Sequence, residues 1–309
     1  MTTSARLNAL VELADTGSVR AAAERLYVTE SSVSASIAAL AREVGVPLVE
    51  KQGRGVRLTA AGRTYAGYAR TILGLYEQAL AAARGEDSPE SGLVRLAAVT
   101  TAGEHLLPHL LASFRAAHPK MGIRLDVAPR DAVWRMFEHH EVDLVVAGRP
   151  PEHLRATVRA IRPNTLVVVG SPQMTQDFSA EAATWLLRED GSGTRATCLG
   201  LLANLERQPA TLTLGSNGAV VAAAVAGLGV TLVSRDAVAA HLLRGGLAEL
   251  AMPGTPLERP WHAVTHARVT PSARTASWYS RRSPILPALR AASTRSGRTA
   301  MCQPARRRT

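Results

Sequence analysis

The chain has 309 residues, enough for two or three domains with buried cores. Hydrophobic residues make up 46% of it, but no apolar run approaches the roughly 18 residues of a membrane-spanning helix. Because the first residues also lack a secretory signal pattern, we expect a cytoplasmic protein with no membrane partner. The two cysteines, Cys198 and Cys302, lie too far apart in sequence to suggest a disulfide framework or a thiolate metal site.

The formal net charge is +11, and most of the excess lies at the C-terminal end. Residues 281–309 contain eight arginines and no acidic residue, whereas residues 85–280 are balanced. This segment is rich in Ser, Thr, Pro and Gly, a composition that predicts a basic disordered tail. Two interpretations stay open for it: non-specific attraction to DNA phosphates, or a solvated tail without a role, the second being favoured.

Residues 1–58 have the pattern of a winged helix-turn-helix. Apolar residues recur at one-turn spacing over 7–14 and again over 33–40, which predicts two of three short helices. Ser18 and Thr29 are suited to cap the second and third helices. Residues 48–58 then predict two short strands around a Gly-rich turn.

Residues 59–85 predict a long linker helix that begins at Thr59. Its apolar and small residues recur with spacings of four and three, at Tyr65, Ala69, Ile72, Tyr76, Ala79 and Ala83. A heptad seam of this kind favours pairing with a second copy of the helix over packing onto the chain's own domains.

The polar segment 86–92 contains Gly and Pro and predicts a hinge. Beyond it, apolar runs of strand length alternate with helical stretches, which predicts parallel βαβ units in an effector domain over 93–280. We expect lobe I at about 93–161 plus 254–280 and lobe II at about 162–253. A ligand cleft would lie between them at the carboxyl ends of the strands.

The chain resembles LysR-type transcriptional regulators over residues 4–280. The most specific matches are in the segments 17–40, 46–50 and 53–62, and looser ones occur in order at 106–108, 142–144, 188–195 and 227–230. The string Gly-Ser-Gly-Thr-Arg at 191–195 resembles members that control carbon dioxide fixation or sulfur metabolism. The resemblance implies an α/β protein with an N-terminal winged helix-turn-helix, a linker helix and a two-lobed periplasmic-binding-protein-like domain. It also implies a homodimer or a dimer of dimers on double-stranded promoter DNA.

The candidate DNA contacts lie around the third helix, whose first turns would enter the major groove with short side chains. They are Ser18, Arg20, Thr29, Glu30, Ser31, Ser32, Ser34, Ala35 and Arg54. Glu30 has two open interpretations: a base contact, or a negative charge that stabilises the helix N-terminus. Arg54, at the tip of the wing, is suited to a phosphate or a narrow minor groove, and a solvated turn arginine is the alternative. Glu30, Ser31 and Ala35 depart from the residues common in the family, so the bases read are not determined.

The candidate effector residues lie in two loops, each before a helix, where hydroxyls and free backbone amides suit an anion. They are Thr100, Thr101 and Gly103 in the first lobe and Ser192, Gly193 and Thr194 in the second, with Gly148 and Asn217 completing the set. Ordinary helix capping is the alternative for each loop. Together they predict a small carboxylate, phosphate or sulfur oxyanion as the effector.

The sequence contains no set of residues typical of an enzyme active site. The Gly-containing loop 227–229 leads into a predicted strand, so it is not a dinucleotide-binding fingerprint. Zinc-ligand spacing is absent among His105, His109, His139 and His140. The sequence also contains no Gly-x-Ser-x-Gly nucleophile elbow. We therefore expect no catalysis, no metal and no cofactor. Two alternatives to a regulator remain. One is a cytoplasmic solute-binding protein, which the winged-helix spacing opposes; the other is a non-specific nucleoid-type DNA-binding protein, which the neutral charge of 85–280 opposes.

Overall fold

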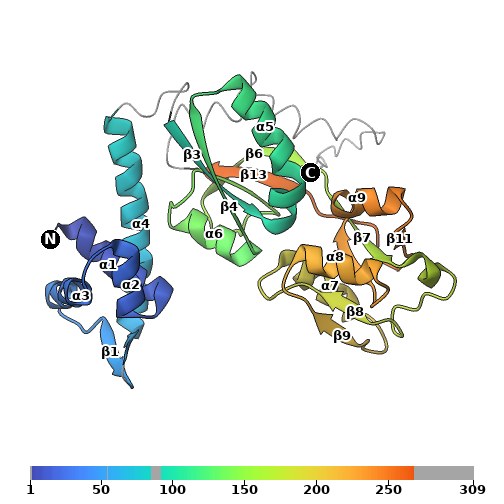
Figure 1. Ribbon diagram of the computed structural model, residues 1–309, viewed down its shortest axis with the longest axis horizontal. Coiled ribbons are helices and arrows are strands. Elements are labelled where there is room, and N and C mark those ends of the chain that lie inside the picture. Colours follow the sequence, from blue (N-terminus) through green and yellow to red (C-terminus); the bar gives the residue numbers. More distant parts are fainter. Residues whose placement is uncertain (1, 54, 85–91, 268–309) are drawn as a thin grey trace, which may run out of the picture.

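The computed structural model describes residues 2–53, 55–84 and 92–267. A small helical N-terminal domain, a long helix and a two-lobed α/β domain follow one another along the chain (Figure 1). No helix in this described part is long and apolar enough to cross a membrane. Arg54, nearly all of the predicted hinge and the basic tail at 281–309 lie outside the described residues.

The N-terminal domain is a winged helix-turn-helix. Its elements are α1 (Thr3–Thr16), α2 (Val19–Leu26), α3 (Glu30–Val44), β1 (Val49–Gln52) and β2 (Gly55–Leu58), the last two forming an antiparallel hairpin. The hydroxyls of Ser18 and Thr29 accept hydrogen bonds from backbone N–H groups at the starts of α2 and α3, as the sequence predicts. Ser36 is 2% exposed although it is polar, and its Oγ donates to the Ser32 carbonyl at 2.7 Å. That bond lets a small polar side chain be buried.

The linker helix α4 (Ala60–Ala83) packs against α1. The predicted pairing seam is partly wrong, because Ala69 is 0% exposed within the core of the chain's own N-terminal domain and Tyr65 packs against that core. Since α1 covers this side, the exposed large apolar side chains of α4 are Tyr68, Ile72, Leu75 and Tyr76. The surface open to a second copy therefore keeps the later part of the predicted seam, where Ile72, Tyr76, Ala79 and Ala83 are exposed.

The middle of α4 contacts lobe I. A Cβ added at Gly74 would lie 2.6 Å from the carbonyl oxygen of His139, so glycine allows a backbone approach that any other residue would prevent. Thr71 Oγ1 lies 3.3 Å from His139 Nδ1. Arg70 bonds to Asp15 of the DNA-binding domain and lies 4.0 Å from Glu141 of lobe I. The linker helix thus connects the two domains through direct side-chain contacts.

Lobe I has a sheet in the order β4-β3-β5-β13-β6, with α5 and α6 on opposite faces (Figure 1). Its elements are β3 (Gly92–Val99), the π-helical turn η1 (Ala102–Leu106), α5 (Leu107–Ala117), β4 (Met121–Ala128), α6 (Arg130–Glu138), β5 (Leu144–Ala147), β6 (Ala156–Arg162) and β13 (Trp261–His266). β3 runs parallel to β4 and β5, as the βαβ pattern predicts, while β13 is antiparallel to both of its neighbours.

Lobe II departs from the predicted parallel arrangement. Its elements are β7 (Thr165–Gly170), η2 (Pro172–Thr175), β8 (Trp185–Leu187), α7 (Gly193–Leu202), β9 (Thr211–Thr213), α8 (Asn217–Val225), β10 (Thr231–Ser234), α9 (Arg235–Leu243), β11 (Ala248–Glu249) and β12 (Leu257–Glu258). β8 and β9 are parallel, but β10, β11 and β12 all pair antiparallel with β7. The chain enters this lobe along β7 and returns along β12, so these two strands must run in opposite directions. β12 also moves the return to lobe I from the expected 253 to about residue 259.

Candidate effector cleft and DNA-contact helix

A cleft lies between the lobes, beside the two segments that connect them. Its volume is about 50 Å³, far below the roughly 300–1,000 Å³ of a pocket for a drug-sized ligand. Asn164, on the first connecting segment, donates from Nδ2 to the Arg259 carbonyl on the second at 2.9 Å. Ser234 Oγ in turn donates to Asn164 Oδ1 at 2.6 Å. These two hydrogen bonds hold together the two segments that connect the lobes. The cleft beside them is of a size that suits a compact ligand.

Each lobe contributes to the cleft the residues that follow its strands, where ligands of α/β sheets usually bind. From lobe I these are Thr100 and Thr101 after β3, Arg130 after β4 and Gly148 after β5. From lobe II they are Arg188 and Glu189 after β8 and Ser192, Gly193 and Thr194 at the start of α7.

Two arginines bring positive charge into the cleft. Within the described residues, no carboxylate lies within ion-pair distance of the Arg259 guanidinium, and Arg130 has only Asp131, at 3.6 Å. Burial, and then the charge of Arg130, lower the pKa of Arg259. A Cβ built on Gly193 would lie 2.6 Å from Arg259 Nη2, so this guanidinium lies against the N-terminus of α7. Two cations and the positive end of a helix dipole therefore converge at one place.

A third arginine in the cleft is neutralised. Arg188 is 4% exposed, and its Nε and Nη2 donate to both carboxylate oxygens of Glu189 at 2.7 and 2.6 Å. Burial by itself would raise the pKa of Glu189, but hydrogen bonding and charge from Arg188, with the charge of Arg195, outweigh it and lower that pKa. The carboxylate is therefore ionised and cancels the charge of Arg188. Among the described residues, the charge of the cleft that no carboxylate pairs is that of Arg259, with Arg130 paired only to Asp131.

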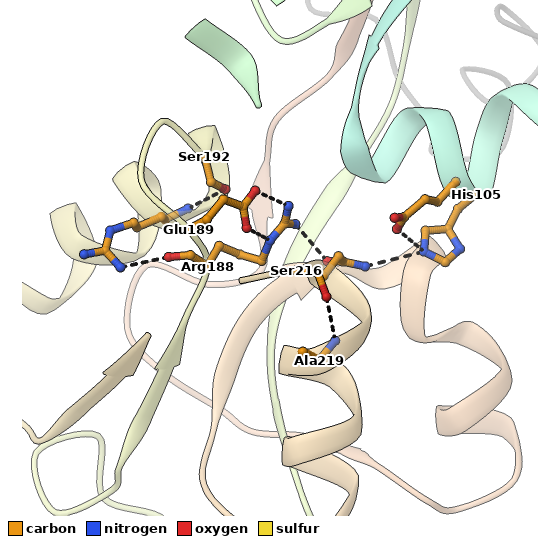
Figure 2. Close-up of polar contacts among 9 residues, drawn as sticks. His105, Arg188, Glu189, Ser192, Ser216 and Ala219 are labelled. Atoms are coloured by element: carbon orange, nitrogen blue, oxygen red, sulfur yellow. Dashed lines mark hydrogen bonds and ion pairs between the residues drawn. The ribbon is translucent and has the colours of Figure 1, made fainter. Parts of the chain in front are cut away.

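A polar contact joins the lobes beside the cleft (Figure 2). His105, on the π-helical turn η1, places Nε2 3.5 Å from Nδ2 of Asn217, the first residue of α8. The same Nε2 lies 3.7 Å from Glu104 Oε2. Asn217 Oδ1 accepts from Arg188 Nη1 at 3.1 Å. A side chain of lobe I is thereby connected to an arginine that lines the cleft in lobe II.

The structure brings together six of the eight predicted effector residues: Thr100, Thr101, Gly148, Ser192, Gly193 and Thr194. Gly103 does not line the cleft. It is buried, and a Cβ there would lie 2.6 Å from a methyl group of Val127, so its position is explained by close packing. Asn217 does not line it either, because this side chain is 3% exposed and lies behind Arg188, while Ser216 caps α8. Ser192 Oγ also caps its helix, accepting from the Arg195 N–H.

The sequence reasoning missed the charged residues of the cleft. Arg130 and Arg188 each follow a strand, so the argument that selected Thr100 could have found them. Arg259 and Asn164 lie on the connecting segments, and no local pattern indicates that these segments meet. No local pattern distinguishes His105 from His109, His139 and His140. Among the described residues, no group of three or more His, Cys, Asp or Glu side chains could hold a metal ion.

The DNA-contact candidates that the structure describes lie at the starts of α2 and α3. Glu30, Ser31, Ser34 and Ala35 are exposed on α3, whereas Ser32 is half-buried. Thr29 and Ser18 are occupied as helix caps, and Thr29 Oγ1 also lies 2.9 and 2.8 Å from the hydroxyls of Ser31 and Ser32. Arg20 Nε pairs with Glu24 at 3.0 Å. Hydrogen bonding to Glu24 raises the pKa of Arg20. The exposed end of α3 presents short polar and apolar side chains, which allow close approach to base edges.

A winged helix-turn-helix joined to a two-lobed ligand-binding domain defines a ligand-responsive DNA-binding protein. The lysR-family bacterial regulatory helix-turn-helix model matches residues 4–63, and the LysR substrate binding domain model matches residues 87–280. The chain is 31% identical over 284 residues to the HTH-type transcriptional regulator CfxR of Cupriavidus necator, covering 89% of each protein. It is 34% identical over 266 residues to the RuBisCO operon transcriptional regulator of Acidithiobacillus ferrooxidans, covering 81% of this chain and 84% of that protein.

Two solved structures share the fold. Full-length CbnR in complex with its target DNA is 21% identical, with a TM-score of 0.61 over 94% of this chain and 100% of that one. The CcmR regulatory domain of Synechocystis PCC6803 in complex with 2-PG is 24% identical, with a TM-score of 0.58 over 66% of this chain and 99% of that domain. The chain belongs to the LysR family of bacterial transcriptional regulators.

Proposed function

We propose that this regulator binds promoter DNA sequence-specifically and that a small anion held between its lobes changes this binding. The observation that carries the proposal is the convergence on the start of α7 of Arg259, which no carboxylate of the described residues pairs, and Arg130, which pairs only with Asp131. Hydroxyls of Thr100, Thr101 and Thr194 surround the same cleft and can donate to an anion. The ligand class is a compact phosphate or carboxylate, and the reported 2-PG complex of CcmR supports 2-PG as a first probe.

The anion proposal is tested by calorimetric titration of the full chain with 2-PG, inorganic phosphate and small carboxylates. Removing a charge-assisted donor leaves the ligand's charge unpaired, so Arg259→Ala should weaken binding about 10- to 100-fold. Arg235→Ala is the matched control, because that arginine lies on α9, pairs with Glu249 at 2.7 Å and does not line the cleft. Thr101→Val with Thr194→Val should weaken the same ligand without unfolding the domain. Equal affinity of the wild type and the Arg259 variant would refute the site.

The DNA-binding proposal places Ser31, Ser34 and Ala35 at the bases and Arg20 and Arg54 at the phosphates. Sequence-specific binding predicts a large affinity difference between a cognate promoter and random DNA that persists as salt is raised, whereas a nucleoid-type protein would bind both alike. One relative is named as a regulator of the RuBisCO operon, so the promoter of such an operon is a suitable first target. Similar binding curves for both DNAs at every salt concentration would favour the nucleoid-type alternative.

A further inference from the structure

The contact between His105 and Asn217 is constrained from both ends (Figure 2). Asn217 is 3% exposed, and its Oδ1 is occupied by the hydrogen bond from Arg188 Nη1. The amide therefore turns Nδ2, which can only donate, toward His105 Nε2 at 3.5 Å. His105 can accept this hydrogen bond only as a neutral imidazole with no proton on Nε2.

Both ends of the contact lead into the cleft. His105 lies on η1, the turn directly after Thr100 and Thr101. Single π-helical turns of this kind are frequent at functional sites. On the other side, Asn217 fixes Arg188, which lines the cleft with its partner Glu189. The contact is therefore suited both to hold the lobes together and to orient a cleft arginine.

We propose that His105 and Asn217 form a latch that holds the lobes closed over the anion, with Asn217 a positioning residue for Arg188 and not a ligand. This inference rests on the proposed anion function of the cleft. A ligand held by both lobes binds more tightly when closure is favoured, so the latch adds to its affinity. The ring of His105 faces Glu104 on its own turn and the Asn217 amide on lobe II, with the Arg188–Glu189 ion pair behind that amide. Protonation of His105 strengthens its attraction to Glu104 and removes the acceptor for Asn217, so the latch opens.

The latch is tested by titrating the full chain with 2-PG at about pH 8 and about pH 5.5, which span the range in which histidine changes charge. His105→Gln is the matched variant, because its amide oxygen accepts at either pH. Any change in the protonation of the ligand affects both proteins alike, so it cancels in the ratio of wild-type to His105→Gln affinity. We expect that ratio to fall about five-fold on acidification, and His105→Leu to bind about five-fold more weakly than the wild type at the higher pH.

Asn217→Asp provides a second test, in which acidification should strengthen the contact with His105 instead of breaking it. The new carboxylate can still accept from Arg188, but it bonds to His105 only when Nε2 carries a proton. Its affinity for 2-PG should therefore fall less on acidification than that of the wild type, or rise, even though the added negative charge weakens anion binding at both pH values.

Two outcomes separate failure of the latch from failure of the cleft. If Arg259→Ala weakens 2-PG binding as expected but the wild type, His105→Gln and Asn217→Asp share one pH profile, the cleft stands and the latch is overturned. If neither 2-PG nor inorganic phosphate binds any of the proteins, hydrogen exchange of the ligand-free chain at about pH 8 decides the latch. Amides of 102–106 and 217–221 should then exchange faster in His105→Leu than in the wild type and His105→Gln, and equal exchange in all three overturns the proposal.

Discussion

His266 is enclosed between two rings, with centroids 3.9 Å from those of Phe137 and His140. Burial, and then the charge of His140, lower the pKa of His266 to about 4. Burial is also the first cause of the lowered pKa values of His139 and His140. In the unfolded chain, histidine imidazoles take up protons at about pH 6.5. Below that pH the unfolded state binds more protons than the folded state, so the stability of lobe I falls as the pH drops from about 6.5 toward 4.

Replacing His266 with Phe should reduce this acid sensitivity, because an aromatic ring is kept in the stack and one titrating group is removed. The melting temperature of His266→Phe should lie close to that of the wild type at about pH 7.5 and above it at about pH 5. Melting curves over this range measure the difference. A gap between the two proteins that does not change with pH would contradict the assignment of the acid sensitivity to His266.

At the scale of the elements, Gly74 permits α4 to pack against lobe I, and Gly67 provides a matched control on the same helix. A Cβ at position 74 would lie 2.6 Å from the His139 carbonyl oxygen, whereas one at position 67 would lie 3.7 Å from the nearest atom, His139 Cε1. Gly74→Ala should therefore displace α4 from lobe I and speed hydrogen exchange around 137–142. Gly67→Ala should leave exchange there unchanged and stabilise the helix by about 1 kcal/mol. Unchanged exchange in the Gly74 variant would show that α4 does not dock there in solution.

The exposed apolar side chains of α4 also predict how two copies of the chain pair. Ile72 is 51% exposed beside Tyr68, Leu75 and Tyr76, and a paired helix would bury this surface. Ile72→Glu should therefore shift the full chain from dimer to monomer in analytical ultracentrifugation at tens of micromolar. Thr64→Glu, also exposed on α4, is the control and should remain dimeric. Dimers of unchanged stability in both variants would exclude this face as the pairing surface.

At the scale of the whole molecule, a two-fold dimer should read two half-sites of an interrupted palindrome. Ser34 is exposed on α3, so Ser34→Arg should change which operator is preferred. Arg54→Ala should weaken all operators alike, because phosphate contacts position the protein while base contacts specify the sequence. Binding to a panel of half-site variants distinguishes the two. Equal losses across the panel for both substitutions would refute this division of roles.

The elements of the DNA-binding domain follow from local signals in the sequence. Ser18, Thr29 and Thr59 cap helices because their hydroxyls reach backbone amides three residues away, an interaction that depends only on neighbouring residues. The two hydroxyl-bearing loops of the cleft were predictable for a related reason. Thr100 and Ser192 precede helical segments, and the carboxyl ends of strands meet at one edge of an α/β sheet.

Tertiary structure decided the features that depend on residues far apart in sequence. Ala69 is buried because α1 covers it, which removes it from the predicted seam and leaves Ile72 exposed beside Tyr68. Arg259 reaches the start of α7 because the chain returns to lobe I only after β12. Asn217 contacts Arg188 and His105, two side chains that are far from it in sequence. The sequence by itself thus determined the family, the order of the elements and the hydroxyl-bearing half of the cleft. The cations of the cleft and the contact between the lobes depend on long-range packing, which periodicity and capping do not encode.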